Sequence, residues 1–139
     1  MRDIVRLPEF ENHALGVHIL LDLKGCDKRI LKSAKRIEEA MIEAAKKARA
    51  TIVGYQFHEF SPYGTSGMVI IAESHLSIHS WPEYHSAAID IFTCGDLGCD
   101  VAANYLYHVF RAKDHDIKIV PRLTSKKARP HKINIESGR

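Results

Sequence analysis

The chain lacks a disulfide framework and any apolar run long enough to cross a membrane. Its three cysteines, Cys26, Cys94 and Cys99, are an odd number, which favours a reducing compartment. No apolar stretch approaches the ~20 residues that a membrane-spanning helix needs. The first residues, MRDIVRLPEFENH, place acids and a proline before any apolar run, unlike a signal peptide. We therefore expect a cytoplasmic protein with no membrane partner.

The chain also has little net charge and no room for a second core. A length of 139 residues indicates one domain, and 45% apolar with 27% charged residues is typical of globular proteins. The formal charge is only +3, and much of it lies in a basic tail over residues 123–139. This tail has no interleaved aromatic residues, so we expect a solvated end and no nucleic-acid partner. Residues 1–13 are interpreted as an N-terminal extension.

Hydrophobic periodicity predicts an α+β fold. Alternating or β-branched runs predict strands at residues 14–23, 51–60, 68–81, 87–93 and 116–122. Steps of three and four predict a five-turn helix from Ile30 to Ala48, with Asp27 as N-cap. A second helix is predicted over about residues 100–113, with Val101 and Tyr105 on its apolar face.

These elements predict a two-layer sandwich in which both helices cover one face of a mainly antiparallel sheet. Several strands carry apolar residues on both faces, as in the run Val69, Ile70, Ile71. The second sheet face then needs a cover, and another copy of the chain is the simplest one.

Reactive residues concentrate in 73-ESHLSIHSWPEYHSAAIDIFTCG-95. His75 and His79 share one face of an extended strand but lie about 13 Å apart, too far to chelate one zinc ion, so no metal site is predicted. Ser74, His79 and Glu83 are residue types of a hydrolase, as is Cys94 with a histidine, but no nucleophile-elbow motif surrounds Ser74. Taken singly, Cys94 and His79 are better interpreted as structural residues.

As a block, the stretch resembles the short prokaryotic type of self-processing, pyruvoyl-dependent S-adenosylmethionine decarboxylases. That family carries Glu-Ser-His-x-x-x-His-x-Trp-Pro-Glu-Tyr, followed by Asp-x-x-Thr/Ser-Cys-Gly. The resemblance extends upstream through 62-PYGTSG-67 to 15-LGVHILLDLKGCD-27 and covers about residues 14–120.

The resemblance implies that the chain cuts itself between Glu73 and Ser74, giving a β chain of residues 1–73 and an α chain of residues 74–139. The Ser74 hydroxyl would attack the Glu73 carbonyl and convert the amide into an ester. Removal of the Ser74 α-proton would expel the Glu73 carboxylate, and the dehydroalanine would hydrolyse to a pyruvoyl group and ammonia. His79 matches the family's processing base, and Ser66 matches the serine that assists it.

The mature pyruvoyl group would form a Schiff base with the substrate amine and accept electrons as carbon dioxide leaves. Cys94 matches the family's proton donor. For substrate binding, Glu83 matches the glutamate that takes the ribose hydroxyls, and Phe60 matches an aromatic residue that stacks on adenine. The family works as a homodimer with its sheets face to face, and its product feeds spermidine biosynthesis.

Three alternatives remain at this point. The first is a different substrate, because relatives of this family decarboxylate arginine or ornithine. The segment 95-GDLGCDVAAN-104 bears on substrate specificity, because it departs from the family's usual Asp-Pro-rich run and contains an unexpected Cys99. A non-catalytic partner subunit would have lost Ser74, His79 or Cys94, and all three are present. A nucleic-acid-binding module would rest on the basic tail alone.

Overall fold

The computed structural model describes residues 3–6, 14–93 and 97–124 of the chain. Its strands are β1 (Ala14–Lys24), β2 (Ile52–Glu59), β3 (Thr65–Ile71), β4 (Ser74–Trp81), β5 (Ser86–Thr93) and β6 (Asp114–Thr124). Its helices are α1 (Lys28–Leu31), α2 (Ala34–Lys47), α3 (Cys99–Val109) and the 3₁₀ turn η1 (Pro82–Tyr84). β6 continues two residues into the segment that the sequence assigns to the basic tail.

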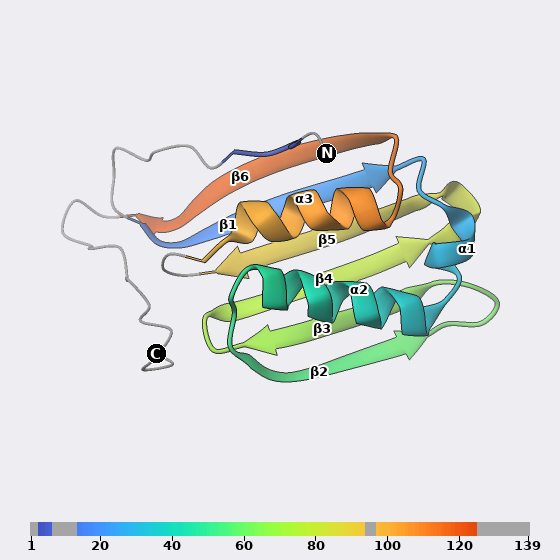
Figure 1. Cartoon of the computed structure of the whole chain (residues 1–139), viewed down its shortest axis with the longest axis horizontal. Coiled ribbons are helices and arrows are strands. Elements are labelled where there is room, and N and C mark those ends of the chain that lie inside the picture. The colour runs from blue at the N-terminus through green and yellow to red at the C-terminus, as the bar shows by residue number, and fades with distance from the viewer. Residues whose placement is uncertain (1–2, 7–13, 94–96, 125–139) are drawn as a thin grey trace.

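The six strands form one antiparallel sheet in the order β2-β3-β4-β5-β1-β6. α2 and α3 lie side by side on the same face of this sheet (Figure 1). The predicted two-layer α+β architecture is therefore confirmed, as far as a single chain can show it. None of the helices in the described ranges is long and apolar enough to span a membrane.

The core lies between the helices and one face of the sheet. Alternate strand residues such as Ile19, Leu21, Ile89 and Ile91 point into it, because side chains of a strand alternate between faces. The opposite face, which we call the open sheet face, carries partly exposed apolar residues, namely Leu20, Met68, Ile70 and Val120. Apolar residues therefore do occupy both faces of the sheet.

The predicted helix over residues 30–48 is in fact two helices. Asp27 caps α1 as expected, its carboxylate accepting a bond from the Arg29 amide. Ser33 then starts α2, because its Oγ accepts a bond from the Arg36 amide at 3.2 Å and supplies a new N-cap. The periodicity survives the break, since Ile30 and Ile37 are both buried, and this is why the pattern suggested one helix.

Two further predictions need correction. The strand predicted over residues 68–81 is a hairpin, with β3 and β4 joined at Ala72 and Glu73. α3 ends at Val109 rather than near residue 113, and Val101 is 46% exposed. The buried face of this helix is instead built from Ala102, Ala103 and Leu106, and the two small alanines allow α3 to pack closely against α2.

Candidate functional site

The Glu73–Ser74 bond joins the turn of the β3–β4 hairpin to the first residue of β4. Ser74 has φ of 146°, a region that residues other than glycine rarely adopt, so the backbone here is strained. By register Ser74 pairs with Ile71 and Thr93, both of which are buried on the helix side of the sheet. Ser74 thus keeps its place in the strand register but does so with a positive φ.

The Glu73 side chain is buried and helps to hold this hairpin. The residue has no exposed surface, and its Oε1 accepts a hydrogen bond from the Thr51 amide at 3.1 Å. The Ala72 amide donates to the Thr51 carbonyl at 2.8 Å. The turn is thus bound to Thr51, directly before β2, through the Glu73 side chain and the Ala72 backbone.

Four of the residues singled out from the sequence converge at the other end of β4. Phe60, Ser66, His79 and Glu83 line one hollow of about 240 Å³. Ser66 and His79 occupy paired positions of β3 and β4, and Ser66 Oγ lies 2.7 Å from His79 Nδ1. A hydroxyl–imidazole pair of this geometry fixes the orientation of the ring and leaves its Nε2 for another partner.

The same hollow contains residues for which the sequence suggested no role. Tyr63 and Trp81 line it, and the His79 and Trp81 rings lie 6.4 Å apart at a tilt of 39°. Thr65 also lines it, and its buried Oγ1 has no hydrogen-bond partner among the described residues. Trp81 belongs to the sequence block that carried the resemblance, so the motif marked this residue. The motif did not show that its side chain lines the same hollow as His79.

Ser74 does not reach this hollow within one chain. His79 lies five positions after Ser74 along β4, which corresponds to about 16 Å at ~3.3 Å per residue. The two residues also belong to different faces, because His79 pairs with Ser66 and Ala88, whereas Ser74 pairs with the buried Thr93. One copy of the chain therefore holds the Glu73–Ser74 bond and the Ser66–His79 pair apart.

Cys94 lies outside the described residues, but the structure places its neighbour. Thr93, one residue before it, pairs directly with Ser74. Thr93 also hydrogen-bonds the thiol of Cys99, whose pKa is raised mainly because the group is buried. The chain segment that leads into Cys94 therefore runs past the serine.

A metal ion has no obvious ligand set in the part of the chain that is described. No group of three or more His, Cys, Asp or Glu side chains there is arranged to hold one. Among these residues Cys26 and Cys99 are both free and buried thiols.

Comparison with known proteins points to one family. Residues 17–123 match the family model described as S-adenosylmethionine decarboxylase. An S-adenosylmethionine decarboxylase proenzyme of Thermodesulfovibrio yellowstonii is 51% identical over 102 residues, covering 73% of this chain and 76% of the relative. A proenzyme of the same name from Thermosipho africanus is 44% identical over 133 residues, covering 88% of this chain and 98% of the relative.

A solved structure agrees with these sequence relatives. The crystal structure of the adenosylmethionine decarboxylase from Aquifex aeolicus superposes with a TM-score of 0.77 at 33% sequence identity. The match covers 86% of this chain and 99% of the Aquifex chain. The likeness therefore includes nearly the whole of that fold.

Proposed function

The chain belongs to the S-adenosylmethionine decarboxylase family, and we propose that it decarboxylates S-adenosylmethionine with a pyruvoyl group made from its own Ser74. The product would be S-adenosylmethioninamine, the aminopropyl donor for spermidine. The observation that carries the proposal is the strained serine at a hairpin turn, directly after a buried and anchored glutamate. Strain at a bond that must be rearranged lowers the cost of reaching the reactive geometry.

The residues at the hairpin fit the chemistry of self-cleavage. Ser74 supplies the β-oxygen that attacks the Glu73 carbonyl, so that the amide C–N bond breaks as an ester C–O bond forms. The Glu73 anchor to Thr51 holds the carbonyl side of that bond in place while the serine moves. A base then removes the Ser74 α-proton, and the Glu73 α-carboxylate leaves from the β-carbon.

His79 is proposed as this base, with Ser66 positioning its ring. The 2.7 Å contact from Ser66 Oγ to His79 Nδ1 supports an imidazole whose Nε2 is directed toward an incoming group. Once formed, the pyruvoyl group would supply an electron sink for the departing carboxylate. Cys94, next to the residue that pairs with Ser74, is proposed to return a proton to the substrate carbon.

The hollow beside His79 is proposed to bind the nucleoside part of the substrate. Phe60 offers an aromatic face for adenine, and its ring is braced by an edge contact with His58 at 4.6 Å between centroids. Glu83 offers a carboxylate for the ribose hydroxyls from the same wall.

The separation of Ser74 from His79 supports a homodimer as the working unit. Two copies packed with their open sheet faces together and their strands running in opposite directions would bring opposite ends of β4 toward each other. The β3–β4 turn of one copy, which carries the Glu73–Ser74 bond, would then lie near His79 of the partner subunit. The partly exposed apolar residues Met68 and Ile70 would be covered in the same step.

The cleavage is tested by denaturing mass spectrometry of freshly expressed protein. We expect two fragments that meet at Glu73–Ser74, the second beginning with pyruvoyl in place of serine. Release of carbon dioxide from S-adenosylmethionine, and not from arginine or ornithine, would then identify the substrate. An intact 15.7 kDa chain after prolonged incubation would refute the proposed cofactor.

The shared site is tested by co-expressing a Ser74→Ala chain with a His79→Ala chain that carries a different tag. Each variant alone should stay uncut. In the mixed dimer, the His79→Ala chain should be cut, because Ser74 in that chain receives His79 of the partner subunit. Isolated mixed dimers in which neither chain is cut would show that His79 acts within its own chain.

A further inference from the structure

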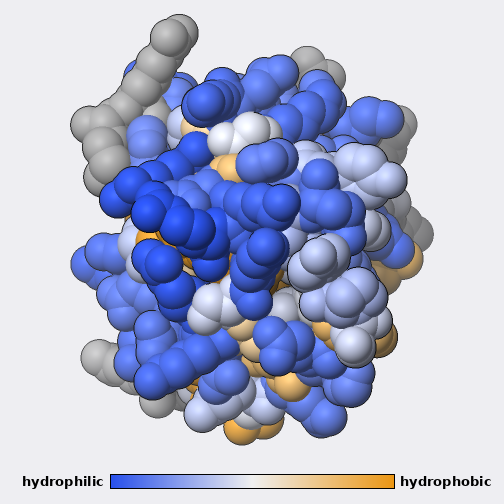
Figure 2. All heavy atoms as spheres, turned by 90° about the vertical axis from the view of Figure 1, so that its right-hand side faces the viewer, coloured by the Kyte–Doolittle hydropathy of each residue, from blue (hydrophilic) through white to orange (hydrophobic). Residues whose placement is uncertain are grey.

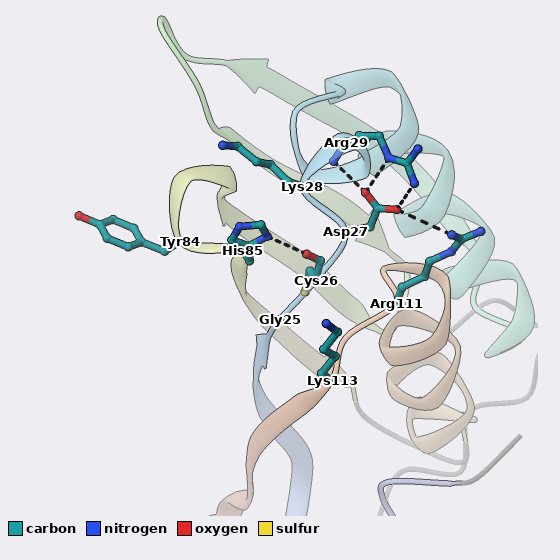
Figure 3. A pocket seen from close by; sticks show the side chains of 9 residues that line it. All are labelled: Gly25, Cys26, Asp27, Lys28, Arg29, Tyr84, His85, Arg111 and Lys113. Carbon is teal, nitrogen blue, oxygen red and sulfur yellow. Dashed lines mark hydrogen bonds and ion pairs between the residues drawn. The ribbon is translucent and has the colours of Figure 1, made fainter.

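A second hollow, of about 780 Å³, lies outside the residues assigned to the proposed reaction. It is formed where the β1–α1 connection, the α3–β6 connection and η1 meet (Figure 3), at the end of the molecule that carries α1 (Figure 1). That end presents mostly hydrophilic side chains to solvent (Figure 2). We call this hollow the basic pocket, because four of its lining residues are Lys28, Arg29, Arg111 and Lys113.

One carboxylate faces these four cations, and the two arginines share it. Asp27 Oδ2 lies 3.0 Å from the Arg29 guanidinium and 3.8 Å from that of Arg111. Hydrogen bonds from Arg29 lower the pKa of Asp27 to about 2, so the carboxylate stays ionised at neutral pH. Asp27 thereby pairs with both guanidinium groups, while the pocket keeps an excess of positive charge.

The two lysines have no such partner. Neither Lys28 nor Lys113 lies within ion-pair distance of a carboxylate in the described ranges. The stem of Lys113 packs over Gly25, where an added Cβ would lie 3.0 Å from Lys113 Cβ and 3.3 Å from its Cγ. This close approach holds the lysine stem at the wall of the pocket and leaves its ammonium group available.

The frame of the pocket is fixed by backbone contacts. The Cys26 amide donates to the His85 carbonyl at 2.9 Å, and His85 Nδ1 lies 3.2 Å from the Cys26 carbonyl. Gly25, His85 and Arg111 all have positive φ, at 66°, 52° and 54°. A cationic hollow whose walls are held this way is organised before any ligand arrives, which reduces the ordering cost of binding.

We propose that the basic pocket binds a polyphosphate group, carried either by a nucleotide or by free inorganic polyphosphate. Ammonium and guanidinium groups are the side chains that bind phosphate oxygens, and 780 Å³ is within the size range of small-molecule sites. Tyr84 lines the same pocket and is 74% exposed, so a base attached to the phosphates has an aromatic face to stack on. The sulfonium substrate is itself a cation and would be repelled here.

The test is calorimetric titration of the full-length protein with tripolyphosphate and, separately, with ATP, at low and high salt. We expect saturable binding of both that weakens as salt rises. Replacing both lysines, in Lys28→Gln/Lys113→Gln, should weaken binding about tenfold or more, because two charge-assisted hydrogen bonds are lost. The matched control is Lys35→Gln/Lys46→Gln, which removes the same charge from exposed helix positions outside the pocket.

The variant Tyr84→Ala distinguishes a nucleotide ligand from free inorganic polyphosphate. If a nucleotide is the ligand, ATP should bind more tightly than tripolyphosphate, and Tyr84→Ala should remove only that advantage. If free polyphosphate is the ligand, the two probes should bind equally and Tyr84→Ala should change neither. The proposal is overturned if neither probe saturates the protein, or if the control variant loses as much affinity as the pocket variant.

Discussion

Ser66 and His79 are joined by a hydrogen bond of 2.7 Å between Oγ and Nδ1, across directly paired positions of β3 and β4. Both residues belong to regular strands, so the pair is held by the sheet rather than by a loop. An imidazole fixed in this way presents one defined nitrogen to whatever approaches from the open sheet face.

Removing the hydroxyl should therefore slow the proposed self-cleavage without unfolding the chain. We expect Ser66→Ala to reduce the cleavage rate by about tenfold or more, because the ring of His79 loses its orientation. Ser66→Thr keeps a hydroxyl at the same strand position and should retain much more of the rate. Time courses of fragment appearance by mass spectrometry measure both, and equal rates for the two variants would contradict a positioning role.

The anchor between Glu73 and Thr51 should contribute to stability. In a Ser74→Ala background, which cannot be cut, Glu73→Leu should lower the free energy of unfolding by about 1–3 kcal/mol, because the Thr51 amide loses its acceptor. Glu73→Gln keeps an oxygen in place and should cost less. Urea denaturation separates the two, and a leucine variant as stable as the glutamine variant would show that packing alone matters here.

Gly67 should tolerate no side chain. A Cβ at this position would lie 1.9 Å from Phe57 Cδ1, since the Phe57 ring lies over the glycine across the β2–β3 pair. We expect Gly67→Ala to destabilise the fold by about 1–3 kcal/mol through overpacking. Gly54→Ala is the matched control, because nothing lies within 4 Å of a Cβ there.

The clash at Gly67 can be checked by a double-mutant cycle. Phe57→Ala should remove the obstacle, so that adding Gly67→Ala to it costs much less than adding it to the wild type. Thermal or urea unfolding of the four proteins measures this, and strictly additive losses would place the strain elsewhere.

Acid should weaken the fold partly through His75. Burial, and then the nearby His18, lower the pKa of His75, although Asp90 opposes this. The unfolded chain therefore takes up a proton on this residue at a higher pH than the folded chain does. Its contribution to stability is fully present above pH ~6.5 and is lost as the pH falls toward the lower folded-state pKa.

The measurement is the thermal midpoint of wild type and His75→Gln between neutral and mildly acidic pH. The midpoint of the wild type should fall more steeply on acidification than that of the variant. Parallel curves for the two proteins would show that His75 is not responsible for acid sensitivity in this range.

The sheet could largely be predicted from sequence, because its strands alternate clearly and one face is buried. The hairpin at Ala72 and Glu73 could not, since 68-MVIIAESHLSIHSW-81 contains no Gly, Pro, Asn or Asp to mark a turn. The break at Ser33 was hidden for a related reason, because the apolar spacing of Ile30 and Ile37 continues through it. Turn and cap positions here depend on side-chain contacts, which periodicity does not encode.

The proposed site could be predicted in its residue types but not in its layout. The resemblance selected Phe60, Ser66, His79 and Glu83, and the fold brings these four to one hollow. The spacing of Ser74 and His79 along a strand already separates these two residues, but it could not show that the other three gather around His79, away from Ser74. The sequence carried no signal for the basic pocket either, because its four cations come from the start of α1 and from the α3–β6 connection, which only the folded chain brings together.

The strand order determines how the two fragments would stay associated and refold after the proposed cut. β1 would belong to the fragment of residues 1–73, yet it lies between β5 and β6, which would belong to the other fragment. The strands of the two fragments would remain interleaved in one sheet, and neither fragment would contain all six strands. Folding must then precede cutting, and a processed molecule that unfolds would have to find its other half by diffusion. Its recovery from denaturant would therefore depend on protein concentration more steeply than that of an uncut chain, for which only the pairing of two copies depends on concentration.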